Sequence, residues 1–279
     1  MYPILLQVGV LGLRTFPLVL ALAIWVGVKL AAAEGRRRGL DPGLATDFLT
    51  TAVVLGLAGA RLFHMLLFDP GWYLAHPADV LAVWTGGLAF PGALLAGVGG
   101  AIWFCRRAGV GFWRFADAAA PGLALGQGIG AVAAFLNGSG YGTPTHLPWA
   151  VVFADPRGQA PLGIPLHPAQ LYEAVGAVLL FGVLWGVRTR FRQDGALFLV
   201  YLAGVFALAG LDFVRGDALW MAEAGPAAPM VGVIGLIGAA LLWRRQRSAG
   251  PVLHAAGRFG LTDPDEAAAP GALPPPRSP

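Results

Sequence analysis

Residues 126–153 read GQGIGAVAAFLNGSGYGTPTHLPWAVVF, and this stretch decides how the chain around it is interpreted. Its first half is an apolar run, rich in glycine and alanine, that meets one polar side chain, Asn137, in a glycine-rich turn. A segment with such small side chains lets backbones approach each other or a ligand closely. The stretch therefore predicts an apolar helix that packs tightly and ends at a point of close contact.

The composition of the chain places this helix in a membrane. Of the 279 residues, 57% are hydrophobic and 12% are charged, and the mean hydropathy is +0.67. A soluble domain has about 25% charged residues, and the apolar runs are too long for the alternating strands of a β-barrel. The isoelectric point is near 9.7, but the basic residues stand in short clusters between apolar runs, which a membrane explains better than a nucleic-acid partner. We expect an all-α, polytopic integral membrane protein and no nucleic-acid binding.

Seven apolar runs have close to the ~20 residues that cross a bilayer core. They cover approximately residues 15–33, 45–68, 88–104, 116–136, 171–187, 196–213 and 226–243. Twelve arginines follow the first, third, fifth and seventh runs: Arg36, Arg37, Arg38, Arg106, Arg107, Arg114, Arg188, Arg190, Arg192, Arg244, Arg245 and Arg247. The other side holds only Arg14, Arg157 and Arg215. Because Lys and Arg are enriched in cytoplasmic loops, we expect the N-terminus outside and the C-terminus in the cytoplasm.

The last part of the chain differs from the rest in composition. Residues 1–247 are expected to form one transmembrane domain. Residues 248–279 are rich in Ala, Pro and Gly, cannot bury a core, and are expected to be a disordered cytoplasmic tail. The single cysteine, Cys105, excludes an intramolecular disulfide, and the five histidines lack metal-ligand spacing. We therefore expect neither a metal nor a cofactor.

Two ionisable side chains lie inside the second apolar run, where charge is costly and often functional. Arg61 and His64 are three residues apart, so they share a helix face. In one interpretation Arg61 binds a phosphodiester, because a guanidinium holds phosphate oxygens in bidentate fashion. In the other, both side chains reach out to the interface or fix a contact within the helix bundle.

A second polar face opens the fifth run. His167, Gln170 and Glu173 follow one another at intervals of three, so they stack on one side of the helix. Glu173 is then a carboxyl group just inside the bilayer. Either it serves a site, or it pairs with Arg61 or caps a neighbouring loop.

Two further sites of charge lie at helix ends. Asp212 and Arg215, at the end of the sixth run, are spaced to form an ion pair along one helix face, and they are also candidates for a site. Asp117, at the start of the fourth run, is expected to stabilise the positive N-terminus of its helix.

Six stretches of the chain resemble the bacterial prolipoprotein diacylglyceryl transferases in their order and spacing. They read GARLFHMLLF, AVWTGGLAFPGALLAG, WRFADAAAPGLALGQGIG, LPWAVVF, HPAQLYE and GLDFVRGD. The family signature, roughly G-x-G-R-x-G-N-F-x-N-G-E-x-x-G, keeps its frame at Gly128, Gly130, Phe135, Asn137, Gly138 and Gly142. The resemblance implies a seven-span fold in the bacterial inner membrane. It also implies transfer of diacylglycerol from phosphatidylglycerol to the thiol of a lipobox cysteine, which leaves a thioether and releases glycerol phosphate.

The chain departs from the family pattern at polar positions. The family's Tyr, His, Arg, Asn, Glu and Arg are replaced, in chain order, by Phe16, Pro91, Ala131, Ala134, Ser139 and Leu208. Loss of one donor that stabilises developing charge typically lowers a rate by ~10²–10³. The replacements predict little or no diacylglyceryl transfer.

The resemblance assigns roles to the family residues that remain. The catalytic candidates are His167, Glu173 and Asp212. The substrate-binding candidates are Arg61, Asn137, Gly142, Gln170, Tyr172 and Arg215. Two interpretations stay open: a divergent transferase, and a non-catalytic relative that binds phospholipid, a lipoprotein signal segment or another membrane protein. A small-solute transporter is a weaker third, because the sequence shows no internal repeat.

Overall fold

Helices dominate the structure, a computed structural model that describes residues 4–8, 11–68, 70–81, 89–191 and 193–216, together with Ala240 and Arg244. The helices are α1 (Thr15–Arg37), α2 (Leu44–Leu67), α3 (Pro70–Ala75), α4 (Phe90–Arg107), α5 (Phe112–Asn137), α6 (Ala169–Val187) and α7 (Ala196–Leu208). Two 3-10 turns, η1 (Pro77–Leu81) and η3 (Ala209–Val214), follow α3 and α7. Strands β1 (Ile4–Val8) and β2 (Leu11–Arg14) pair antiparallel, as do β3 (Val151–Val152) and β4 (Pro165–Leu166).

Six of the seven expected spans coincide with α1, α2, α4, α5, α6 and α7. Among the described helices, α1, α2, α5 and α6 are long and apolar enough to cross a bilayer, and α7 is a shorter apolar helix. The predominantly helical, membrane-type architecture is thus confirmed. The expected seventh span at 226–243, apart from Ala240, and the expected tail at 248–279 lie outside the described residues. The two short β-hairpins were not predicted.

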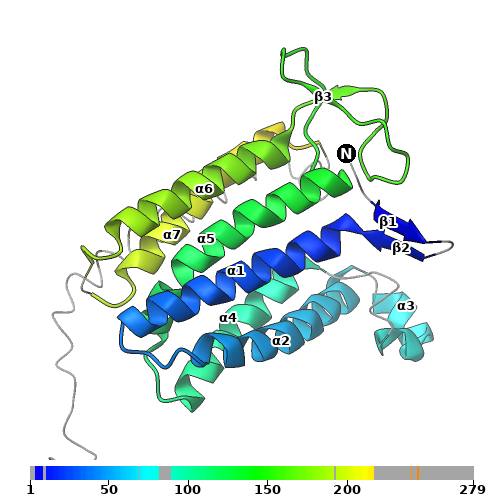
Figure 1. Cartoon of the computed structure of the whole chain (residues 1–279). Coiled ribbons are helices and arrows are strands. Elements are labelled where there is room, and N and C mark those ends of the chain that lie inside the picture. Colours follow the sequence, from blue (N-terminus) through cyan, green and yellow to red (C-terminus); the bar gives the residue numbers. More distant parts are fainter. Residues whose placement is uncertain are drawn as a thin grey trace, which may run out of the picture.

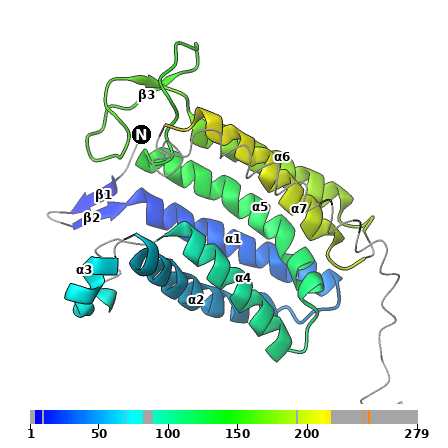
Figure 2. The same ribbon diagram turned by 180° about the vertical axis from the view of Figure 1, so that it is seen from behind.

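Helix α5, which contains the first half of the quoted stretch, lies between α1 and α6, and α2 and α4 pack together beyond α1 (Figures 1 and 2). Glycines allow the helices to approach closely. A Cβ at Gly122 of α5 would overlap the carbonyl of Gly27 on α1, and a Cβ at Gly92 of α4 would overlap the carbonyl of Gly59 on α2. Small residues at such crossings are typical of helix packing in membranes, where close backbone contact drives association.

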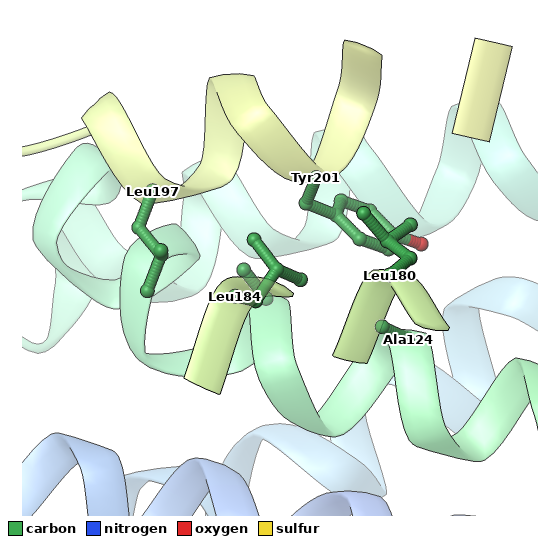
Figure 3. Close-up of a cluster of buried hydrophobic side chains, with 6 residues drawn as sticks. Ala124, Leu180, Leu184, Leu197 and Tyr201 are labelled. Atoms are coloured by element: carbon green, nitrogen blue, oxygen red, sulfur yellow. The ribbon is translucent and has the colours of Figure 1, made fainter. Parts of the chain in front are cut away.

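A cluster of buried side chains holds α5, α6 and α7 together (Figure 3). Leu184 of α6 and Leu197 of α7 are fully buried, and they pack with Ala124 of α5, Leu180 and Tyr201. This contact fixes the short helix α7 against the two longer ones. The 3-10 turn η3 that continues α7 is thereby held beside the start of α6.

The opposite end of the bundle carries a buried polar network. Asp117, which is fully buried, accepts hydrogen bonds from the backbone N–H groups of Gly195 and Phe198 at 2.9 and 2.7 Å, and from Arg38 at 2.8 Å. Glu34, also buried, pairs with Arg37 and Arg38. Asp117 was expected to stabilise its own helix, but its oxygens satisfy the N-terminus of α7. The network ties α1, α5 and α7 together at the end of the bundle that holds most of the described arginines.

Candidate functional site

Three segments that are far apart in the sequence meet at the end of the bundle near β3 (Figure 1). The first is the loop after α5. The second is His167, which is separated from the start of α6 by Pro168. The third is the end of η3 with the two residues that follow it. Four backbone bonds join them: Gly142 N–H to His167 O at 3.0 Å, His167 N–H to Thr143 O at 3.0 Å, Thr143 N–H to Val214 O at 2.8 Å, and Gly216 N–H to Tyr141 O at 2.8 Å. We call this arrangement the three-segment junction. It places the predicted site residues of α6 and η3 next to the glycine-rich turn.

Gly142 is the centre of the junction. It forms an isolated antiparallel bridge with Arg215, and a Cβ at this position would overlap the carbonyl and the Cβ of His167. The carbonyl of Val214 would lie only 2.8 Å from the same Cβ. The close contact predicted where the apolar helix ends is therefore confirmed in the turn after α5, and it is a contact between backbones.

The turn before Gly142 begins at Asn137, the last residue of α5, which is buried. Gly138 ends the helix in the left-handed conformation, with φ of 78°, and Gly140 follows with φ of 70°. Both angles favour glycine, because a Cβ strains this region of backbone conformation. The Asn137 carbonyl accepts a hydrogen bond from Gln159 N–H at 3.2 Å, which connects the turn to the β3–β4 loop.

Gln170 lies buried beneath this turn. Its side-chain N–H donates to the carbonyl of Ser139 at 2.8 Å, and only 1% of the residue is exposed. Its amide oxygen, also buried, has no hydrogen-bond partner among the described residues. The position where the family pattern has Glu is thus occupied by Ser139, whose backbone binds Gln170.

Glu173 and Arg215 form an ion pair across α6 and η3, with 3.4 Å between Arg215 Nη1 and Glu173 Oε1. About a third of each side chain is exposed. Where one interpretation of the sequence paired Glu173 with Arg61, the structure pairs it with Arg215. The side chain of Asp212 lies outside the described residues, although its backbone belongs to η3.

An aromatic chain of hydrogen bonds begins on the loop before β3. The indole N–H of Trp149 donates to the Tyr172 hydroxyl at 2.7 Å, and that hydroxyl lies 3.3 Å from His167 Nδ1. Tryptophans near a bilayer surface commonly serve as interfacial anchors, whereas Trp149 has a specific side-chain partner. Its partnership with Tyr172, 23 residues away in the sequence, could not be predicted from the spacing of either residue.

Arg61 lies on a different part of the bundle from the junction. It is 4% exposed, and its guanidinium donates to the backbone carbonyls of Asp79 and Val80 in η1. The ring of Tyr73 in α3 lies 5.0 Å from the guanidinium carbon. These contacts favour the alternative in which Arg61 fixes a bundle contact, and they do not join Arg61 to Glu173 or Arg215.

An apolar cavity of about 410 Å³ runs between α1, α2 and α5. Its wall on α5 extends from Phe115 to Gly130, which is about 22 Å of helix. Gln127 is the one polar side chain in a lining otherwise made of small and aliphatic residues with two phenylalanines. Such a space suits a hydrocarbon chain.

The loop around β3 carries a separate surface ion pair. Arg157 binds Asp155 through 2.8 and 3.0 Å contacts, and the hydrogen bond from the arginine lowers the pKa of that carboxyl to about 2. Both side chains are satisfied within the loop. We therefore assign them no part in the site.

Comparisons with known proteins agree on one family. A sequence profile described as Prolipoprotein diacylglyceryl transferase matches residues 3–244. A phosphatidylglycerol–prolipoprotein diacylglyceryl transferase of Synechococcus elongatus is 33% identical over 269 residues, covering 91% of this chain and 92% of that protein. Proteins of the same name from Azoarcus sp. and Solidesulfovibrio magneticus are 38% and 39% identical, over 74% and 76% of this chain and 78% and 81% of their own length. The similarity thus extends through the helices that carry the three-segment junction.

Proposed function

Because this chain belongs to the prolipoprotein diacylglyceryl transferase family, we propose that it transfers the diacylglyceryl group of phosphatidylglycerol to a cysteine thiol of a prolipoprotein. The observation that carries the proposal is the three-segment junction. It gathers Gln170, Glu173 and Arg215 with His167 at one end of an apolar helix bundle. A lipid headgroup at the membrane surface meets polar groups at that depth, while its acyl chains stay among the helices.

The reaction needs a cation and a proton acceptor. The thiol sulfur bonds to the glycerol carbon as that carbon's bond to phosphate oxygen breaks, and glycerol phosphate leaves with the bonding electrons. We assign phosphate binding to Arg215, because a guanidinium makes paired, charge-assisted bonds to phosphate oxygens. Glu173, already beside Arg215, is assigned to take up the thiol proton, directly or through water. A catalytic part for Asp212 rests on the family resemblance.

The apolar cavity supplies a place for the hydrocarbon of the lipid. Its lining on α5 is apolar except for Gln127, and its volume is about 410 Å³. Burial of each CH₂ contributes about 0.8 kcal/mol. One acyl chain in this cavity would hold the lipid while its headgroup reaches the junction.

The remaining parts of the proposal concern the setting. We place the protein in the bacterial inner membrane as a multi-pass protein, with a seventh span at 226–243 and a cytoplasmic tail from residue 248. The junction then faces outside, where a prolipoprotein signal segment presents its cysteine. The described arginines at the C-terminal ends of α1 and α4 and just after α6 support this orientation, because these helix ends lie opposite the junction.

A non-catalytic, lipid-binding relative is the second candidate. The observation that favours it lies on α5, where Ala131 is buried and carries no polar group at the family's arginine position. With further polar groups replaced at Pro91 and Ser139, each missing donor should lower the rate by ~10²–10³. We predict that turnover by the purified protein is more than tenfold below that of the Synechococcus elongatus protein assayed beside it. Equal rates would contradict this prediction.

Complementation separates the two candidates. The gene is expressed in a strain depleted of its own transferase, and attachment of diacylglycerol to a reporter prolipoprotein is followed by mass spectrometry. Any restored lipidation that is lost with Arg215→Gln supports the transferase. If the full-length protein accumulates in the membrane and the reporter stays unmodified, the transferase proposal fails and the lipid-binding candidate stands.

A further inference from the structure

The hydrogen bonds of Trp149, Tyr172 and His167 have a defined direction. An indole N–H can only donate, so Trp149 donates to the Tyr172 oxygen. The Tyr172 proton then needs an acceptor, and within the described part of the chain His167 Nδ1 is the group available to it. If His167 Nδ1 carried a proton and donated instead, the Tyr172 proton would have no acceptor among these residues. The arrangement that satisfies every group has Nδ1 accepting.

An accepting Nδ1 determines where the proton of the imidazole lies. In neutral histidine one ring nitrogen accepts and the other carries the proton, and the bond made by the first selects the second. We propose that Trp149 and Tyr172 are positioning residues that hold His167 in its Nε2–H tautomer, so that Nε2 donates a hydrogen bond to a phosphate oxygen of the lipid headgroup. This inference rests on the proposed function for its ligand, and it excludes His167 as the base that deprotonates the thiol.

The surroundings of His167 suit a fixed donor. Its backbone is bound on both sides by the glycine-rich turn, through Gly142 N–H and the Thr143 carbonyl. The Tyr172 ring lies edge-on to the imidazole, with 6.1 Å between the ring centres. Among the described residues Nε2 has no hydrogen-bond partner, so its proton is available to a ligand.

The same junction carries a cation, Arg215, that can bind a phosphate. Gly142 connects His167 to Arg215, since it donates to the His167 carbonyl and bridges Arg215 on its other edge. A neutral N–H donor on the same junction as the Arg215 guanidinium, which also pairs with Glu173, complements an anionic oxygen. A histidine base would need its lone pair on the nitrogen that faces the ligand, and the Tyr172 bond places that lone pair on the other nitrogen.

The first test is spectroscopic and does not depend on activity. Full-length protein labelled with ¹⁵N-histidine is placed in nanodiscs, and the ring nitrogens of His167 are assigned by loss of their signals in His167→Gln. We expect Nδ1 to show the signal of an unprotonated nitrogen and Nε2 that of a protonated one. In Tyr172→Phe the two tautomers should become mixed, whereas Tyr201→Phe, a buried tyrosine on α7, should leave the spectrum unchanged. A protonated Nδ1 in the wild type, or no response to Tyr172→Phe, would overturn the proposal.

The second test uses substitutions that separate donor from base. His167→Gln keeps an N–H donor and cannot accept a proton, whereas His167→Glu can accept a proton and has no N–H to donate. If His167 is a donor, the Gln variant should keep at least about tenfold more transfer than the Glu variant. The reverse order would refute the donor role. Absence of transfer by the wild type would count against the proposed function, and the tautomer experiment would still decide the positioning role.

Discussion

Arg61 shows how one side chain's contacts can redirect a functional prediction. Its guanidinium is buried and already binds the carbonyls of Asp79 and Val80. A hydrogen bond to a charged group contributes about 1.5–3 kcal/mol. We therefore predict that Arg61→Gln lowers the melting temperature in detergent and speeds proteolysis within residues 70–81, while phosphatidylglycerol retained per folded molecule is unchanged. Reduced phosphatidylglycerol with unaltered stability would instead restore the phosphate-binding role.

The matched control for Arg61→Gln is Arg157→Gln. Arg157 is also an arginine with hydrogen-bond partners in a loop. Its side chain, however, is half exposed and pairs with Asp155 at the surface. Surface ion pairs contribute little to stability. The melting temperature of Arg157→Gln should therefore equal that of the wild type.

At the scale of a helix, the position of α7 depends on an acceptor supplied by α5. Asp117 is fully buried and accepts hydrogen bonds from the N–H of Gly195, which caps α7, from the N–H of Phe198 in its first turn, and from Arg38. Removing one partner from a buried pair of this kind costs about 3–5 kcal/mol. We predict that Asp117→Ala destabilises the protein by that amount and raises amide exchange at residues 196–199 before it does so in α1. Asp117→Asn keeps an acceptor and loses the charge. Its stability should therefore lie between those of the wild type and Asp117→Ala. Uniform exchange across the molecule would contradict a local role in docking α7.

At the scale of the whole molecule, the sequence predicted the helices well and their partners poorly. Six of the expected apolar runs coincide with helices, because the bilayer sets the length of an apolar helix. The β1–β2 hairpin was missed, since an apolar segment of 11 residues with two glycines has no periodicity long enough to separate strand from coil. The Glu173–Arg215 pair joins residues that are 42 apart in the sequence, so no local spacing indicates it, and only the three-dimensional arrangement of α6 and η3 brings them together. Asp117 likewise binds a helix that begins 79 residues later, which no local pattern indicates.

The orientation of the molecule in the bilayer provides a further prediction. The C-terminal ends of α1, α4 and α6, where arginines cluster, lie at one end of the bundle, and the three-segment junction lies at the other (Figures 1 and 2). We expect a reporter that is active only in the cytoplasm to be active when fused after Arg247, and one that is active only in the periplasm to be active when inserted after Arg157. Activity of a periplasmic reporter after Arg247 would reverse the assignment.

The three-segment junction also bears on how such a protein can diverge. Its four bonds run between main-chain atoms, and every residue type except proline can make them. Space demands glycine at Gly142 and Gly216, because a Cβ at either position would overlap backbone atoms of the junction. Substitutions at Ala131, Ala134 or Ser139 therefore change the reactive surface without loosening the framework beneath it. Related proteins can therefore differ in the side chains of the site while they keep the same fold. Membership of a family and catalytic activity need not change together.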